Sequence, residues 1–241
     1  MLTATAAHTK TSVFLTAGWH NLAMLNFVVD SRLLEPHVPA GTELDFYQDQ
    51  AFVSVVGFQF IQSTVLGIPL PFHRDFEEVN LRFYVVRRAP EGIRRGVVFL
   101  REIAPKWLIS VAARWFYNEK YVTMPMRQRV EPPRVEYEWL RAGRWNGLSV
   151  ETCGDALHPV SGSVEEFVTE HYWGYTKQRD GVTMEYEVEH PPWRVRPVSS
   201  VRYDCDVEAI YGAAFVPFLR EPASALVADG SAVIVRRGRR I

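Results

Sequence analysis

The sequence contains few cysteines and no long apolar run. Cys153 and Cys205 are the only two in 241 residues, fewer than a secreted disulfide scaffold would carry in a shorter chain. We expect two free, buried thiols, with a single bridge between them as the alternative. No window approaches 18 uninterrupted apolar residues, and residues 1–11 are polar and rich in Ala and Thr. We therefore expect neither a transmembrane helix nor a signal peptide, but a cytoplasmic protein with no membrane partner.

An excess of either charge is also missing. Lys and Arg number 27 against 28 Asp and Glu, which gives a formal net charge of -1. A nucleic-acid-binding protein usually has a marked excess of positive charge. The basic tail at residues 236–240 is one short run, and such runs are more often solvated termini. The charge balance therefore predicts no nucleic-acid partner.

Motifs for cofactor and metal binding are absent as well. The chain has no G-x-G-x-x-G, no Walker loop and no G-x-S-x-G elbow. Its seven histidines form no H-x-H or H-E-x-x-H pattern, and there is no C-x-x-C. We expect no cofactor and no metal, and a metal site assembled from distant residues is the alternative.

The organisation along the chain indicates one domain over residues 1–241, with an ordered core of about 13–236. No internal repeat, low-complexity tract or long Pro/Gly/Ser linker divides it. Aromatic residues make up 13%, with 7 Trp, which predicts an aromatic core or pocket.

Most segments have the pattern of β-strands. Residues 51–61 are apolar on both faces, as in a strand covered on both sides. Residues 135–139 and 184–189 alternate apolar and acidic side chains, as in strands with one wet face. Asp180–Gly181 and Asp229–Gly230 stand between such runs, and each predicts a hairpin with a type I′ turn. The second of these hairpins would join residues 224–228 to 231–236.

Helices are few. An apolar stripe predicts one over 105–117, Asp30 caps a short one through Glu35, and Ser163 with Glu166 forms a capping box for one near 164–170. Glu165, Glu166, Glu170 and His171 are either the exposed face of that last helix or acid–base groups. The fold class is therefore α+β, mainly antiparallel β. Many long strands in one domain close into a barrel or pack as two sheets.

The most informative strand is residues 76–88. Val79, Leu81, Phe83 and Val85 form a face that belongs in the core. The other face carries a polar row that consists of Glu78, Asn80, Arg82 and Tyr84. This row is either an ordinary solvent face or the wall of a polar cavity. Glu78 and Arg82 lie roughly 13 Å apart along a strand, so each needs another partner or a ligand. A buried Arg82 would need a carboxylate other than Glu78.

Four segments resemble the YqjF-like bacterial family of unknown function. They are Trp19-His20-Asn21-Leu22, Leu44-Asp45, Glu78-x-Asn80-x-Arg82-x-Tyr84-Val85 and Tyr172-Trp173-Gly174-Tyr175. The resemblance runs from about residue 13 to 228, and the third segment is its most specific element. It implies a fold similar to acetoacetate decarboxylase, a partly closed double-layered β-barrel with about three short peripheral helices.

Acetoacetate decarboxylase-like enzymes form a Schiff base through the first lysine of a Lys-Lys pair that follows a helix, and the second lysine lowers its pKa. The corresponding segment here is Phe116-Tyr117-Asn118-Glu119-Lys120. The resemblance thus places Glu119 at the nucleophile and a lysine, Lys120, only at the helper position. This departure argues against decarboxylation, and Tyr117 and Lys120 join the polar row as candidate ligand-binding residues.

These observations favour a protein that binds a small carboxylate or carbonyl compound, anchored by Arg82, without Schiff-base chemistry. Whether it is an enzyme stays open. The alternatives are a decarboxylase or lyase that uses Lys120, and a structural or interaction protein with a filled barrel. Related folds form oligomers, so a homo-oligomer is expected by analogy alone.

Overall fold

Seven strands form a closed ring in the computed structural model, which describes residues 11–69, 74–105 and 120–241. In ring order, the strands of this described part are β1 (Val13–Val29), β4 (Gln50–Val65), β6 (Phe76–Ala89), β7 (Gly92–Ala104), β12 (Trp173–Lys177), β13 (Thr183–Glu189) and β15 (Ser224–Arg236). The β13–β15 pairing at Val188–Val235 closes the ring. Neighbouring ring strands are antiparallel, except that β7 and β12 are parallel.

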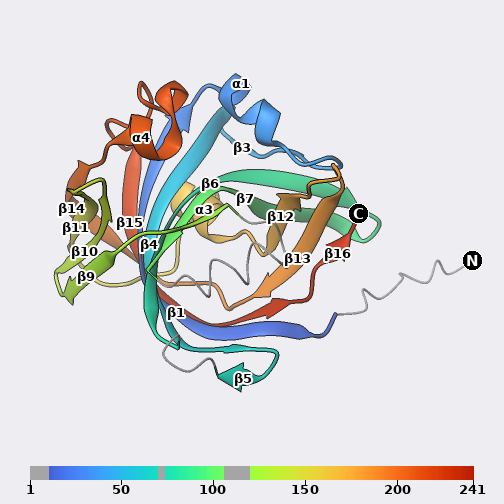
Figure 1. Cartoon of the computed structure of the whole chain (residues 1–241), viewed down its shortest axis with the longest axis horizontal. Helices are drawn as coiled ribbons and strands as arrows, with labels where there is room; N and C mark the ends of the chain where they lie inside the picture. The colour runs from blue at the N-terminus through green and yellow to red at the C-terminus, as the bar shows by residue number, and fades with distance from the viewer. Residues whose placement is uncertain (1–10, 70–73, 106–119) are drawn as a thin grey trace, which may run out of the picture.

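A second sheet packs against the outside of the ring (Figure 1). Its strands are β9 (Met126–Glu131), β10 (Arg134–Arg141), β11 (Arg144–Thr152) and β14 (Val195–Asp204). β14 joins the two layers, since it pairs with β15 through its first residues and with β11 through the rest. Short strands extend the ring sheet at β2 (Glu43–Leu44), β3 (Phe46–Tyr47), β5 (Ile68–Pro69), β8 (Tyr121–Thr123) and β16 (Arg239–Arg240). The expected mainly antiparallel, two-layered architecture is confirmed.

Three short α-helices occur in the described residues, namely α1 (Ser31–Leu34), α3 (Val164–Thr169) and α4 (Val207–Tyr211). Two 3₁₀ turns, η1 (Glu35–His37) and η2 (Ala213–Phe215), follow α1 and α4. The caps predicted at Asp30 and Ser163 are confirmed, since each side chain accepts a backbone N–H of its helix. The pattern analysis missed α4, which Asp206 caps. The helix predicted at 105–117 lies, after its first residue, outside the described residues. None of the described helices is long and apolar enough to span a membrane.

The ring separates two hydrophobic cores. Val79, Leu81, Phe83 and Val85 point outward from β6 into the core shared with the second sheet, as the alternation predicted. Tyr137 of β10 links the second sheet to the ring, since its hydroxyl donates a hydrogen bond to the Asn21 carbonyl oxygen of β1 at 2.9 Å. The inner core occupies part of the ring's interior. α3 lies within the outline of the ring in Figure 1 and adds Phe167 and Val168 to that inner core.

The predicted C-terminal hairpin is wrong, because β15 is one continuous strand through Asp229–Gly230. Gly230 has a φ of +79° and pairs with His20 of β1, next to Asn21, whose φ is +54°. The two residues distort paired strands at the same level, so both strands exchange their inner and outer faces together. Leu22 and Trp19 therefore both face inward, although three positions separate them. The hairpin predicted at Asp180–Gly181 does join β12 to β13, but Asp180 lacks the positive φ of a type I′ turn.

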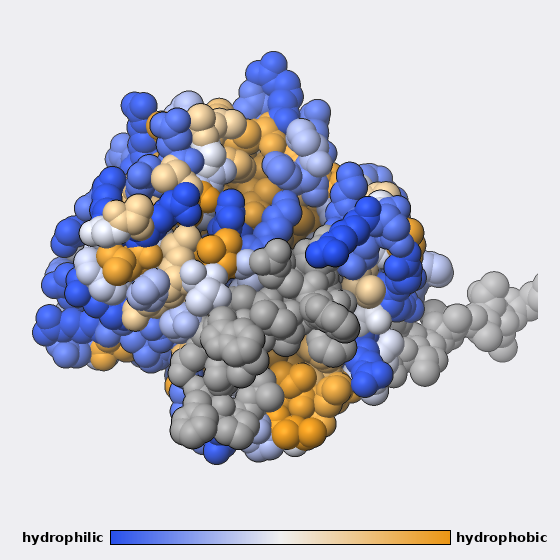
Figure 2. All heavy atoms as spheres, in the orientation of Figure 1, coloured by the Kyte–Doolittle hydropathy of each residue, from blue (hydrophilic) through white to orange (hydrophobic). Residues whose placement is uncertain are grey.

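The two cysteines are unpaired, which confirms the expectation of free thiols, but the prediction that both are buried is wrong. Cys153 is exposed and Cys205 is half-buried. Apolar side chains also reach the surface near β5, where Leu66 and Ile68 are exposed. Figure 2 shows a hydrophobic area at the lower edge of the molecule, where Figure 1 places β1, β4 and β5.

We predict that Gly230→Ala destabilises the fold far more than Gly41→Ala. Both glycines have a φ of +79°, but a Cβ at Gly230 would lie 1.9 Å from the Trp19 carbonyl oxygen, whereas nothing lies within 4 Å at Gly41. The shared φ costs each variant about 1 kcal/mol, and the clash adds about 2 kcal/mol or more at Gly230. Urea unfolding of both variants measures the difference. Equal losses would contradict the close approach of β1 and β15 at Gly230.

Candidate functional site

The interior of the ring contains a cavity to which all seven ring strands contribute side chains. Its volume is about 130 Å³, close to that of an engineered cavity of about 150 Å³ that binds benzene. One wall is aromatic and another is polar. The cavity therefore has room for a small molecule of about the size of one ring.

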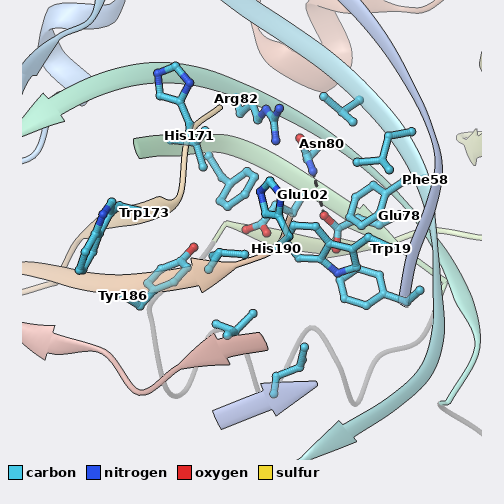
Figure 3. A pocket seen from close by; sticks show the side chains of 18 of the residues that line it. Trp19, Phe58, Glu78, Asn80, Arg82, Glu102, His171, Trp173, Tyr186 and His190 are labelled. Carbon is cyan, nitrogen blue, oxygen red and sulfur yellow. Dashed lines mark hydrogen bonds between the residues drawn. The ribbon is translucent and has the colours of Figure 1, made fainter. Parts of the chain in front are cut away.

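The polar wall begins with three members of the β6 row. Glu78, Asn80 and Arg82 all line the cavity and are all buried (Figure 3). Because alternate residues of a strand share a face, β6 places the three side chains in a line while Val79 and Leu81 anchor the strand on the other side. The row is thus an inner wall of the ring and not a solvent face.

Glu78 is held by two hydrogen bonds and is 2% exposed. Its Oε1 accepts from Asn80 Nδ2 at 3.0 Å, and its Oε2 accepts from the Tyr121 hydroxyl at 2.5 Å. Burial raises the pKa of Glu78 to about 7, against the lowering effects of Tyr121, Asn80 and the Arg82 charge. Both protonation states of this carboxyl group therefore occur near neutral pH.

Arg82 is buried, as expected for a residue of a cavity wall, but the prediction that a carboxylate holds it is wrong. Its Nη2 donates to the Val168 carbonyl at 3.0 Å, just before the end of α3, and no carboxylate among the described residues hydrogen bonds to it. Arg82 Nε is buried and has no partner among the described residues, and the same holds for Asn80 Oδ1. Buried polar atoms are normally satisfied, so this donor and this acceptor are available to a bound molecule.

The aromatic wall is built around Trp19 of β1. Its ring packs edge-on against Phe58 and Phe60 of β4, with centroids 5.4 and 5.7 Å away, and lies 6.3 Å from Trp193. Trp19 Nε1 is buried without a partner among the described residues. Together with Arg82 Nε it gives the cavity two buried donors. These donors suit a ligand that carries oxygen acceptors.

A second carboxylate reaches the cavity through a bulge in β7. The register of β6 and β7 shifts by one residue between the Leu81–Arg101 and Arg82–Phe99 pairs. Because the bulge reverses the alternation, both Phe99 and Glu102 line the cavity. Glu102 is 3% exposed. The alternation rule alone would have placed only one of the two inside.

Two histidines complete the wall. Burial lowers the pKa of both His171 and His190 to about 4, so both are neutral at pH 7. His171 Nε2 lies 3.0 Å from Asp45 Oδ2, and a neutral ring bonded to a carboxylate donates through that nitrogen. His171 Nδ1 is then an acceptor, and it is buried without a described partner. His190 stacks on Trp193 with centroids 4.0 Å apart.

Tyr84 and Lys120, which the sequence also predicted as site residues, do not line the cavity. Tyr84 is buried but is not among the residues that line the cavity. Its hydroxyl lies 2.5 Å from Ser54 Oγ, and its ring centroid lies 4.7 Å from that of His171. Lys120 is exposed and is not among the cavity-lining residues. Tyr117 lies outside the described residues. The described residues that line the cavity include no lysine.

Sequence reasoning missed Glu102, Tyr121, Trp19 and His190 as members of the site. For His171 it weighed an exposed helix face above an acid–base role, but this residue follows α3 and is buried. The sequence contains a weak signal for Trp19 and Tyr121 as site residues, since each is an aromatic residue next to a polar one in the chain. The described residues contain no group of three His, Cys, Asp or Glu side chains that could hold a metal ion.

Residues 16–232 match the model of DUF2071, a family described as an uncharacterized conserved protein, and the chain belongs to this family. It is similar to the uncharacterized protein YqjF of Bacillus subtilis (strain 168), with 27% identity over 183 residues, which is 73% of this chain and 72% of that protein. The resemblance stated from the sequence is therefore confirmed.

Solved structures share the fold at low sequence identity. Acetoacetate decarboxylase from Legionella pneumophila has a TM-score of 0.68 at 11% identity, over 100% of this chain and 92% of that one. The enduracididine biosynthesis enzyme MppR, complexed with pyruvate, has a TM-score of 0.67 at 13% identity, over 98% and 92%. The fold is thus acetoacetate decarboxylase-like, as the sequence resemblance implied.

We predict that Glu78 makes folding stability depend on pH between about 4.5 and 7. Its pKa rises from 4.5 in the free group to about 7 in the fold. The folded state then binds the proton more tightly, so the contribution of Glu78 is full below pH 4.5 and is lost as pH rises to 7. The stability of the wild type relative to Glu78→Gln should fall by about 3 kcal/mol between pH 4.5 and 8.

Urea unfolding across this pH range measures the gap, which is the difference in free energy of unfolding between the wild type and the variant. Glu77→Gln, on the opposite face of β6, is the matched control and should keep a constant gap. A gap for Glu78→Gln that does not change with pH would show that the carboxyl group is not desolvated in the fold.

Proposed function

We propose that this chain binds a small carboxylate or carbonyl compound in the ring cavity and does so without a lysine imine. The observation that carries the proposal is the buried row of Glu78, Asn80 and Arg82 facing a cavity of about 130 Å³. A guanidinium that is buried beside an aromatic wall and has no hydrogen-bonded carboxylate partner among the described residues suits an anionic or strongly polar ligand group. A filled ring would leave no space for such a group.

The buried atoms without partners define how the ligand would sit. Arg82 Nε and Trp19 Nε1 would donate to its oxygens, while the rings of Phe58 and Phe60 cover its apolar part. Pyruvate, which MppR holds in one similar structure, has this chemistry and is a suitable probe.

Protonation of Glu78 would control affinity for an anion. The ionised Glu78 repels a carboxylate in the same cavity, whereas the neutral form does not. The other charged or titratable groups that line the described cavity are Arg82, Glu102, Tyr121, Tyr186, His171 and His190. Both histidines stay neutral well below pH 7, so Glu78 is the group among those with a resolved pKa that changes charge near pH 7.

We predict that pyruvate binding weakens as pH rises above 7, by at most about tenfold per pH unit for one linked proton. Titration calorimetry from pH 6 to 8.5 measures this dependence, which Glu78→Gln should remove. Arg82→Gln should weaken binding by about tenfold or more at every pH, because it removes a charge-assisted hydrogen bond. Binding that is unaffected by Arg82→Gln would exclude this residue as the anchor.

The alternative function, a decarboxylase or lyase that uses Lys120, requires an imine. A Schiff-base lysine must be neutral near pH 7, which needs its pKa to fall by roughly 3 units from about 10.4. Lys120 is exposed and directly follows Glu119 in the chain, and neither feature favours the neutral amine.

We therefore predict that borohydride reduction with acetoacetate or acetopyruvate gives no adduct on Lys120. Mass spectrometry of the digested protein is the measurement, and reductive methylation of the same sample shows that its lysines are reactive. A stable adduct mapped to Lys120 would establish the alternative instead.

A further inference from the structure

Glu78 has the environment of a group that transfers protons and not that of a fixed counter-ion. A counter-ion would hydrogen bond to the nearby guanidinium, but Glu78 bonds instead to the neutral groups of Asn80 and Tyr121. Arg82 affects it only through its charge. Each carboxyl oxygen keeps a second lone pair that these bonds do not use. Glu78 can therefore take up or release a proton without breaking an ion pair.

Arg82 lies on the same wall, two positions beyond Asn80, and is close enough for its charge to lower the pKa of Glu78. Its Nε is a buried donor without a partner among the described residues. A donor fixed in a low-dielectric site stabilises negative charge that develops on an oxygen, without reorganisation of solvent. The wall thus combines a carboxyl group that titrates near neutral pH with a fixed cation.

We propose that Glu78 removes and returns a proton at the carbon next to the carbonyl group of the bound molecule, so that the site interconverts its keto and enolate forms. This inference rests on the proposed function. The C–H bond breaks as an O–H bond forms on Glu78, and the electron pair becomes the C=C bond of an enolate. The C=O electron pair moves onto the oxygen, which accepts a hydrogen bond from Arg82. The reverse step returns to carbon either the same proton or, once the Glu78 O–H has exchanged with solvent, a deuteron, so water is the only other reactant.

The remaining acid–base groups of the described wall are less suited to this step. His171 is bonded to Asp45, which in turn bonds to Arg95 Nε at 2.8 Å, and this arrangement positions its ring. His190 Nδ1 lies 2.9 Å from the Pro191 carbonyl and its ring stacks on Trp193. Glu102 lies on β7, across the β6–β7 pair from Asn80, and its Gln variant is the direct comparison for Glu78.

The test is exchange of the pyruvate methyl protons for deuterium in D₂O, followed by proton NMR at saturating pyruvate. The wild type should exchange them faster than protein-free buffer, with a rate that rises with pH as Glu78 ionises. Glu78→Gln should lose about 100-fold or more of this rate, the usual contribution of a general base. Glu77→Gln, on the opposite face of β6, should exchange at close to the wild-type rate, and Glu102→Gln, which alters the other carboxylate of the wall, should lose less of the rate than Glu78→Gln. Glu78→Asp, which keeps the carboxylate, should retain part of the activity.

Two controls separate the outcomes. Calorimetry with pyruvate comes first, and a wild type that does not bind it refutes the proposed function and the inference together. Pyruvate that binds without accelerated exchange, or exchange that survives in folded Glu78→Gln, overturns the inference alone. Prior treatment with pyruvate and borohydride should leave the exchange unchanged, and its loss would show that an imine carries the reaction.

Discussion

Closure of the ring removes water from one face of β6, and the site depends on that desolvation. In an open sheet, the row of Glu78, Asn80 and Arg82 would be an ordinary wet face. The pairing of β13 with β15 instead places the row inside a cavity with an aromatic opposite wall. Burial then moves the pKa of Glu78 to about 7, and Arg82 is buried without a hydrogen-bonded carboxylate partner among the described residues. The unusual electrostatics of the cavity therefore follow from the topology.

Irregularities in the strands decide which side chains the ring encloses. Asn21 and Gly230 reverse the alternation of β1 and β15 at the same level, so the register between them is kept. The bulge in β7 does the same for Phe99 and Glu102. As a result, β1 supplies both Trp19 and Leu22 to the cavity, and β7 supplies both an aromatic ring and a carboxylate. A regular ring would enclose a different set of side chains.

The similarity to acetoacetate decarboxylase extends to the fold, and the described cavity wall lacks the lysine that Schiff-base chemistry requires. No lysine lines the described part of the cavity, and Lys120 is exposed. The charged groups that line it are instead carboxylates and one guanidinium, with two neutral histidines. Such a set favours recognition of polar oxygen groups and proton transfer over covalent capture of a carbonyl.

The sequence by itself determined the local features of this protein. The alternation of apolar and polar residues predicted the core face of β6 and the solvent face of β10, and the capping residues predicted α1 and α3. These features could be predicted because each depends on residues close together in the sequence. The family signature on β6 also identified three residues of the cavity wall. Only the tertiary structure decided that Asp229–Gly230 lies within a strand, because its turn chemistry was equally compatible with a distortion at the level of Asn21. The positions of Glu102, Tyr121 and His171 were likewise settled by ring closure and a bulge, since no local pattern encodes which distant strands become neighbours.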